Sequence, residues 1–255
     1  MLKTFFNVVF VIIIFSFSAN AITLTDSFDS GINNNLWDIE RYDAINSPWT
    51  IIAPDESYRL RISKSADDGT TTTVAASIQS RFIIGGDFSI WVEYDMIDFP
   101  LANNGGWNYV GLVVRIIDDD GHYNGTYFGS ALNIDDSNQI SFGYANIPPS
   151  EYFGGSIDTT MHGKLGISRE DDTMSAWIDR GYGPVLLGSL TYPELNGAVK
   201  VLFSVNQQPN ILNERPSTSL DVRFDKFSVT AETIIPEPTT FLLLSICVFF
   251  LRKGK

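Results

Sequence analysis

The sequence predicts an all-β protein, built as one antiparallel sandwich of two sheets. Apolar and polar residues alternate with a period of two through most of the chain, as they do in strands that bury one face. Clusters of Gly, Asn and Asp, which favour turns, separate the alternating segments. Between residues 22 and 230 no segment carries apolar residues at a helical spacing over three turns.

Six segments show the alternation most clearly, and each is expected to form a strand. They are residues 88–97, 109–116, 140–145, 174–179, 199–205 and 220–224. The intervening turn clusters are residues 66–69, 85–86, 103–106, 118–121 and 135–138. About a dozen strands joined by polar turns indicate a single large sandwich rather than two domains.

The composition excludes several classes of protein. The chain has 255 residues, of which 30 are acidic and 17 basic, so its formal net charge is −13. Binding to DNA or RNA needs a basic face, and nucleic acid is therefore not an expected partner. A single cysteine cannot form an intramolecular disulfide, which excludes a disulfide-stapled scaffold.

The N-terminal 21 residues have the pattern of a secretory signal peptide. Lys3 precedes an apolar run over residues 5–17, and Ala19-Asn20-Ala21 forms a small-x-small cleavage site. An uncleaved membrane anchor is the alternative, but the apolar run is short for it. We expect cleavage after Ala21 and a fold that begins at Ile22.

The C-terminal end is also expected to be a processing segment. Pro236-Glu237-Pro238 precedes an apolar run over residues 241–251 and the basic residues Arg252 and Lys253. As a helix this run is only about 17 Å long, against a bilayer core of about 30 Å, so transient membrane insertion is favoured. The layout resembles the PEP-CTERM sorting signal. That resemblance implies a bacterial exosortase as partner and a secreted protein of the cell envelope or extracellular surface.

These two ends define the expected organisation of the chain. Residues 1–21 form the signal peptide, 22–230 the β-sandwich, 231–238 a linker, and 239–255 the hydrophobic segment, expected to be helical, with its basic tail. Within the sandwich, four segments occur in a characteristic order: 26–29 with Leu36-Trp37, 86–90, 164–177, and 222–229. They resemble concanavalin A-like (laminin G-like) jelly-roll domains. The family implies a double-sheet sandwich whose concave face or loops often hold sugars or Ca²⁺.

One segment on a predicted strand is a candidate for catalysis. Glu93, Asp95 and Asp98 resemble the Glu-x-Asp-x-(x)-Glu strand of laminarinase-type retaining glucanases, which share the fold. Retention requires two carboxyl groups about 5–5.5 Å apart. Asp98 replaces Glu here, and its position has the opposite parity to Glu93 and Asp95 unless a bulge intervenes. A solvated strand face is therefore favoured over catalysis.

The same strand face is a candidate glycan-binding surface. Trp91, Glu93 and Asp95 share one parity, and Tyr109, Arg115 and Trp177 join them if their strands pair nearby. Aromatic rings stack on the C–H face of a pyranose, while carboxylates and Arg bind hydroxyl groups. The alternative is that Trp91 is covered by a loop and Arg115 only pairs with an acid across strands.

Two acidic clusters are candidates for Ca²⁺. Asp118 and Asp120 lie in the first, and Asp135 in the second. The spacing does not fit an EF-hand, so polar hairpin turns are favoured over an irregular Ca²⁺ site, and no other cofactor is expected. Two histidines 40 residues apart do not suggest zinc.

The hypothesis favoured by these observations is a lectin-like surface or matrix protein that binds polysaccharide without catalysis. The alternatives are a glycoside hydrolase or lyase of the jelly-roll glucanase type, and a structural matrix protein without a ligand. Because the net charge repels anionic polymers, a neutral glycan or a Ca²⁺-bridged contact is expected.

Overall fold

The structure is a computed structural model, and it describes residues 21–42, 49–67, 73–101, 106–118, 120–135, 138–147, 150–157, 159–209 and 216–236. Most of the two predicted processing segments, including Ala19, Glu237, Pro238, Arg252 and Lys253, lies outside the described residues. Ala21 and Pro236 are the first and last residues described. Within these ranges no helix is long and apolar enough to span a bilayer.

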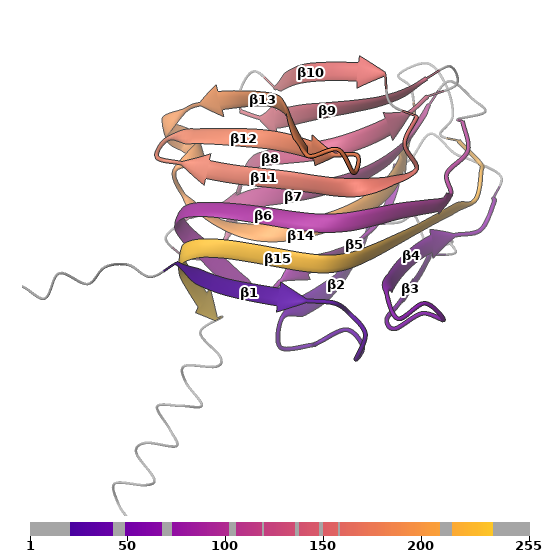
Figure 1. Cartoon of the computed structure of the whole chain (residues 1–255), viewed down its shortest axis with the longest axis horizontal. Helices are drawn as coiled ribbons and strands as arrows, with labels where there is room; N and C mark the ends of the chain where they lie inside the picture. The colour runs from indigo at the N-terminus through magenta and orange to yellow at the C-terminus, as the bar shows by residue number, and fades with distance from the viewer. Residues whose placement is uncertain are drawn as a thin grey trace, which may run out of the picture.

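The described residues form fifteen strands and one turn of 3-10 helix (Figure 1). The strands are β1 (Ile22–Asp26), β2 (Trp37–Tyr42), β3 (Trp49–Ile52), β4 (Leu60–Lys64), β5 (Val74–Ser80), β6 (Phe82–Asp98), β7 (Trp107–Ile117), β8 (Tyr123–Ile134), β9 (Gln139–Asn146), β10 (Glu151–Ile157), β11 (His162–Glu170), β12 (Thr173–Asp179), β13 (Pro184–Thr191), β14 (Ala198–Gln208) and β15 (Leu220–Pro236), and the helical turn is η1 (Pro193–Leu195).

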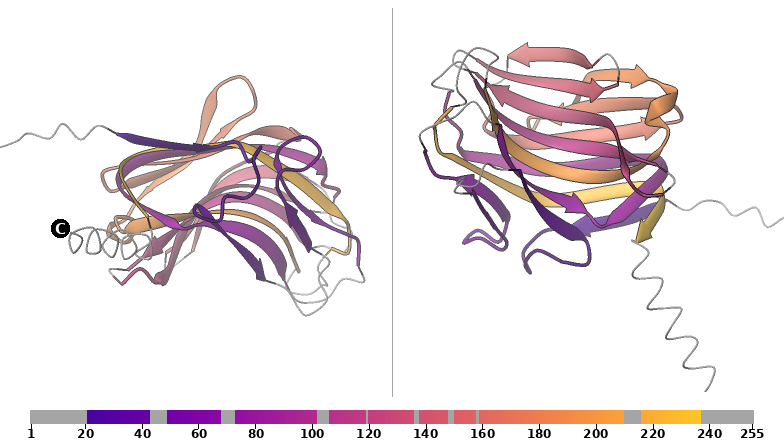
Figure 2. Two further views of the ribbon diagram at one scale, coloured as in Figure 1. Left: turned by 90° about the horizontal axis from the view of Figure 1, so that it is seen from below. Right: turned by 180° about the vertical axis from the view of Figure 1, so that it is seen from behind.

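The strands lie in two layers of antiparallel sheet, as Figure 2 shows from below and from behind. The first layer has the order β2-β5-β14-β7-β8-β9-β10. The second layer has the order β15-β6-β11-β12-β13, with β1 and β4 on the free edge of β15 and β3 beside β4. This architecture is the all-β jelly-roll sandwich that the sequence predicts.

The core lies between the layers and follows the period-two alternation. In β6 the inward residues Phe88, Ile90 and Val92 are buried, and the residues between them are partly exposed. Trp37 stands at the centre of an aromatic cluster and is only 1% exposed. Its indole N–H donates to Asp26 Oδ2 over 2.8 Å, so burial of the ring leaves no polar group unpaired.

The end of the sandwich differs from the prediction. Residues 231–236, expected in a linker, continue β15 and pair with β6 as far as Pro236 and Phe82. The strand continues because Ile234 packs against the core and pairs with Ile84, which is fully buried. The Pro-Glu-Pro tripeptide therefore begins at the last residue of the folded sheet.

Candidate functional site

The outward face of the first layer carries the largest concentration of aromatic side chains outside the core among the described residues. Four rows of cross-strand neighbours run over β14, β7, β8 and β9 and supply outward side chains. A cavity of about 530 Å³ lies over these rows, within the usual size range of ligand pockets. Its lining residues are Trp107, Tyr109, Val113, Arg115, Tyr123, Tyr127, Asn133, Phe142, Tyr144, Tyr152, Leu202, Ser204, Asn206 and Gln208.

This cavity continues into hollows on both sides. Towards β2 it shares Arg115, Tyr123 and Tyr127 with a hollow that Glu40 also lines, and towards β10 it shares Phe142 and Tyr152 with another. We call the three hollows together the cross-strand groove. The groove spans the seven strands of the layer, and six inter-strand spacings of about 4.8 Å make it roughly 29 Å long. This length suits an extended ligand.

Tyr144 is the centre of the aromatic lining. Its ring centroid lies 5.9 Å from that of Tyr109, 5.6 Å from Tyr127 and 5.7 Å from Phe142. Tyr152, 76% exposed, stacks on it at 6.5 Å with an interplanar angle of 23°. The groove thus presents ring faces and edges to solvent over several adjacent strands.

Two glycines in strand interiors make this arrangement possible. A Cβ on Gly111 would lie 2.2 Å from Oη of Tyr109, and one on Gly129 would lie 2.2 Å from Cε1 of Tyr144. Carbon atoms in contact are separated by about 3.5–4.0 Å, so any side chain at these positions would displace the rings. Glycine weakens a strand, and here it allows the tyrosine rings to lie directly on the sheet.

The hydroxyl groups of Tyr109 and Tyr144 form a hydrogen bond with each other. Burial and the neighbouring Tyr144 raise the pKa of Tyr109 well above its usual value. Burial likewise raises the pKa of Tyr144 above the ordinary range. Both phenols are therefore neutral at physiological pH, and they act as hydrogen-bonding groups rather than as bases.

Arg115 is the one charged residue among the described residues that line the central cavity. Its Nη1 donates to Glu40 Oε2 over 2.9 Å and to Gln79 Oε1 over 2.7 Å, and its Cζ lies 5.4 Å from the ring centroid of Tyr123. Asn133 lines the same groove, and its buried Oδ1 has no hydrogen-bond partner in the described structure.

The single face expected from the sequence is divided between two opposite faces of the sandwich. Tyr109 and Arg115 lie in the cross-strand groove of the first layer, whereas Trp91, Glu93, Asp95 and Trp177 point outward from the second layer. The condition that the strand of Tyr109 and Arg115 pairs nearby is not met, because β7 pairs with β14 and β8 while β6 pairs with β11 and β15. For Trp177 it is met, because β12 reaches β6 through β11. On the second layer Trp91 lies over Gly166, the residue that pairs with Trp177.

The three carboxylates considered for catalysis are engaged by other groups. Glu93 forms ion pairs with Lys164 at 3.2 Å and Lys226 at 2.9 Å, and Asp95 with Arg59 at 2.9 Å. Burial raises the pKa of Glu93, but the hydrogen bonds from Lys226 and Lys164 outweigh it and lower the pKa overall.

Asp98 is exposed and accepts a hydrogen bond from Ser219. The register of β15 against β6 shifts between Met96 and Asp98. A bulge at this place is what Asp98 would need in order to share the strand face of Glu93 and Asp95. These contacts indicate a charge-paired strand surface.

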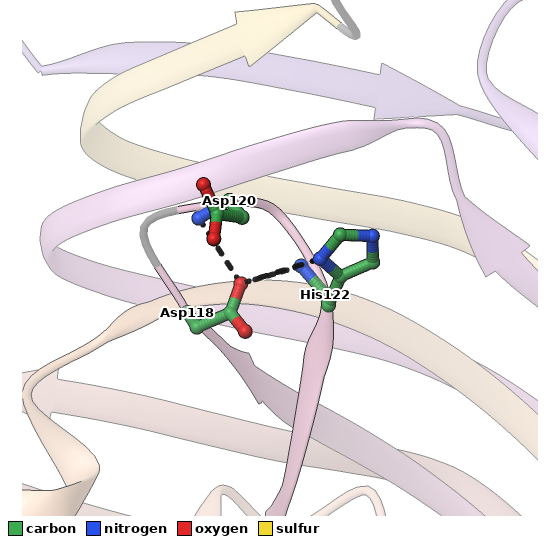
Figure 3. Close-up of side chains that lie close together, drawn as sticks. All are labelled: Asp118, Asp120 and His122. Carbon is green, nitrogen blue, oxygen red and sulfur yellow. Dashed lines mark hydrogen bonds and ion pairs between the residues drawn. The ribbon is translucent and has the colours of Figure 1, made fainter.

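Asp118 organises a hairpin turn. Its Oδ1 accepts the backbone N–H groups of Asp120 over 3.1 Å and His122 over 2.8 Å (Figure 3). Asp118, Asp120 and His122 are exposed and offer ligand atoms within 4.8 Å of one another. Asp135 accepts the N–H of Asn138 over 2.7 Å in a separate turn, so the two clusters do not form one site. A Ca²⁺ site at either turn stays a prediction.

Sequence reasoning missed most of the groove. Tyr123, Tyr127, Phe142, Tyr144 and Tyr152 were not candidates, although the first four occupy alternate positions of β8 and β9 and the fifth lies on the edge strand β10. Aromatic residues at one parity of adjacent strands, with glycines at Gly111 and Gly129, are the pattern that points to such a groove.

The fold is a jelly-roll sandwich that resembles solved polysaccharide-active glycoside hydrolases and lyases. A protein from work on endo-acting O-glycanases of human gut microbiota aligns with a TM-score of 0.60 at 12% identity, covering 82% of this chain and 98% of that one. LamA from Zobellia galactanivorans, solved with laminaritriose and laminaritetraose, aligns with a TM-score of 0.55 at 12% identity, covering 83% of this chain and 98% of that one. The alginate lyase from Klebsiella pneumoniae aligns with a TM-score of 0.52 at 8% identity, covering 81% of this chain and 99% of that one. At these identities the likeness establishes the fold alone.

The sequence itself places the chain in a family. Residues 18–240 match the profile of the DUF1583 C domain, described as a protein of unknown function, and the chain belongs to this family. No curated protein matches the sequence.

Proposed function

We propose that this protein binds polysaccharide in the cross-strand groove without cleaving it. The observation that carries the proposal is the lining of the groove, where tyrosine rings alternate with amide and hydroxyl groups over several strands. Aromatic faces take up the C–H faces of pyranose rings, and amides and phenols bind the hydroxyl groups. The extended shape suits a chain of sugars rather than a single one.

The distribution of carboxylates supports binding over hydrolysis. Hydrolysis by the usual mechanism needs a pair of carboxyl groups on either side of the scissile bond. Among the described residues that line the groove, Glu40 is the one carboxylate, and Arg115 holds it at 2.9 Å. Glu93 and Asp95 lie on the opposite face and are paired with cations.

Affinity electrophoresis in gels that contain single polysaccharides tests the binding function. We expect the wild-type chain to be retarded by at least one polymer of a broad panel. Tyr144→Ala is expected to weaken the interaction about tenfold, because the ring contact and a hydrogen bond are lost together. Tyr182→Ala is the matched control, since Tyr182 is 98% exposed and does not line the groove. Absence of retardation by every polymer, or equal effects of both variants, would refute the proposal.

Polysaccharide cleavage is the second candidate function. The solved proteins of similar fold favour it. Two of them are LamA and an alginate lyase, and the alignment with this chain covers 98% and 99% of their lengths. Incubation with the same panel, followed by assays for new reducing ends and for unsaturated products, tests it. If a polymer is cleaved, Tyr144→Ala and the double variant Glu93→Gln/Asp95→Asn show which face acts. If none is cleaved, binding alone remains.

For the location of the protein we propose secretion, followed by transient insertion of the C-terminal segment and processing by an exosortase. The signal-peptide pattern of residues 1–21 and the Pro-Glu-Pro tail support this proposal. Because β15 ends at Pro236, the tail begins where the sandwich ends and leaves no spacer. Mass spectrometry of the mature protein from the producing cell is expected to find loss of residues 1–21 and of the apolar run. An intact chain would contradict both assignments.

A further inference from the structure

We infer that the polysaccharide bound in the cross-strand groove is acidic and that its sugar carboxylates pair with Arg115. This inference rests on the proposed binding function and names the class of its ligand. It reverses the expectation of a neutral or Ca²⁺-bridged glycan that follows from total charge.

The charge of the groove differs in sign from that of the whole protein. The chain carries a net −13, yet Arg115 is the one charged side chain among the described residues that line the central cavity. Arg41 and Glu40 line the adjoining hollow, so the described residues that line the whole groove carry one net positive charge. A polymer in the groove therefore meets a locally cationic surface, and the potential of a cleft depends mainly on the charges that line it.

Several acidic residues lie on the opposite layer of the sandwich. Glu93, Asp95 and Asp221 belong to strands of the second layer and are paired there with basic side chains. Exposed charges on the opposite face are screened over about 8–10 Å at physiological ionic strength. Total charge is thus a poor guide to the ligand of this groove.

The contacts of Arg115 hold its guanidinium in place and leave donors for a ligand. Nη1 is used by Glu40 and Gln79, whereas Nε and Nη2 have no acceptor among the described residues. An edge formed by two guanidinium N–H groups matches the two oxygens of a carboxylate. The side chain is 28% exposed and lies over Tyr123, so it is ordered before a ligand arrives and still accessible.

The surroundings of Arg115 suit a sugar that carries the carboxylate. Tyr123 and Tyr127 line both hollows that meet at Arg115, and Ser204 supplies a hydroxyl group to both. A uronate can place its ring against a tyrosine while its carboxylate meets the guanidinium. The groove therefore combines the two recognition elements on neighbouring strands.

The test compares polymers that differ only in charge. Polygalacturonate, alginate and polyglucuronate are each paired with the same polymer after reduction of its carboxyl groups to alcohols, and dissociation constants are measured for the full chain. We expect at least one parent polymer to bind about tenfold or more tightly than its reduced form. Arg115→Gln is expected to abolish this preference, so that parent and reduced polymers bind with similar dissociation constants.

Two further variants make the outcome independent of folding defects. Glu40→Gln removes the competing carboxylate, so it is expected to strengthen binding of the acidic polymer more than binding of the reduced one. Arg59→Gln is the matched control, because it removes an equally paired and similarly exposed arginine from the opposite face.

Equal binding of parent and reduced polymers, an unaltered preference in Arg115→Gln, or tighter binding of dextran sulfate than of any polyuronate would overturn the inference. In those cases the glycan-binding function itself would stand. Absence of binding to every polymer, acidic or reduced, would overturn the proposed function as well.

Discussion

Substitution of Gly129 by alanine is expected to weaken ligand binding without unfolding the protein. The new Cβ would lie 2.2 Å from Cε1 and 2.4 Å from Cζ of Tyr144. Since carbon contacts need about 3.5–4.0 Å, the ring has to move by about 1.5 Å. It can do so because it borders the groove rather than the core. The move separates Tyr144 from Tyr109 and Tyr127, which it contacts at the floor of the groove.

The magnitude follows from the contacts that are lost. An aromatic contact contributes about 0.5–1.5 kcal/mol, and a neutral hydrogen bond about 1 kcal/mol, so binding is expected to weaken about tenfold. For the free energy of unfolding, alanine in place of glycine in a strand gains about 0.5–1 kcal/mol. Overpacking costs about 1–3 kcal/mol, and the net loss is therefore expected to stay below about 2 kcal/mol.

Affinity electrophoresis and urea denaturation of Gly129→Ala measure the two effects separately. Gly85→Ala is the matched control, because its Cβ would have its nearest neighbour at an ordinary 3.8 Å and it does not line the groove. Wild-type affinity in Gly129→Ala would refute the placement of Tyr144 in the binding site. A loss of affinity that is matched by unfolding would show a purely structural role.

Three other predictions concern charges and phenols. Glu93→Gln is expected to lower the free energy of unfolding by up to about 1 kcal/mol at neutral pH. Because the pKa of Glu93 is lowered in the fold, this difference should shrink as the pH falls below the ordinary glutamate pKa of about 4.3 and vanish below the lowered pKa, which urea titrations at several pH values measure. Arg169→Met is expected to lower the free energy of unfolding by about 3 kcal/mol or more, because this buried guanidinium donates to three backbone carbonyls that would lose their donor. Thermal melts measure the loss, and an unchanged midpoint would contradict it. Burial raises the pKa values of Tyr109 and Tyr144, so the free energy of unfolding should fall above about pH 10, where these tyrosines ionise in the unfolded chain. The double variant Tyr109→Phe/Tyr144→Phe should reduce that fall in alkaline denaturation curves.

The strand β9 illustrates how far sequence patterns reach into the site. Alternation identifies residues 140–145 as a strand, and hydrophobicity alone favours Ile140, Phe142 and Tyr144 for the core. In the structure these residues face the groove, and Ser141 and Gly143 face inward. The inward positions need small residues, because a Cβ on Gly143 would lie 2.0 Å from Phe153. A partner on another strand therefore decides which face of β9 is buried.

The catalytic and metal candidates also show which contacts can be predicted from the sequence and which depend on distant strands. Spacing places Glu93 and Asp95 on one strand face, and the structure agrees. Spacing does not reveal that Lys164, Lys226 and Arg59, from three other segments, pair with them. Asp118 is different, because the hydrogen bonds that define its role come from residues within four positions of it. Local turn chemistry is accordingly predictable, and long-range charge pairing is not.

The sequence by itself determined that this protein is an antiparallel sandwich, since period-two alternation and turn residues are local properties of a strand and its ends. It also marked the two terminal segments, whose patterns are read directly from residue order. Only the tertiary structure decided which strands became neighbours, and so separated Trp91 and Trp177 from Tyr109 and Arg115. Alternation assigns a side chain to one of two faces, but partner choice depends on packing across the whole core. Binding sites are built across strands, and for this reason the groove emerged only when the layers were assembled.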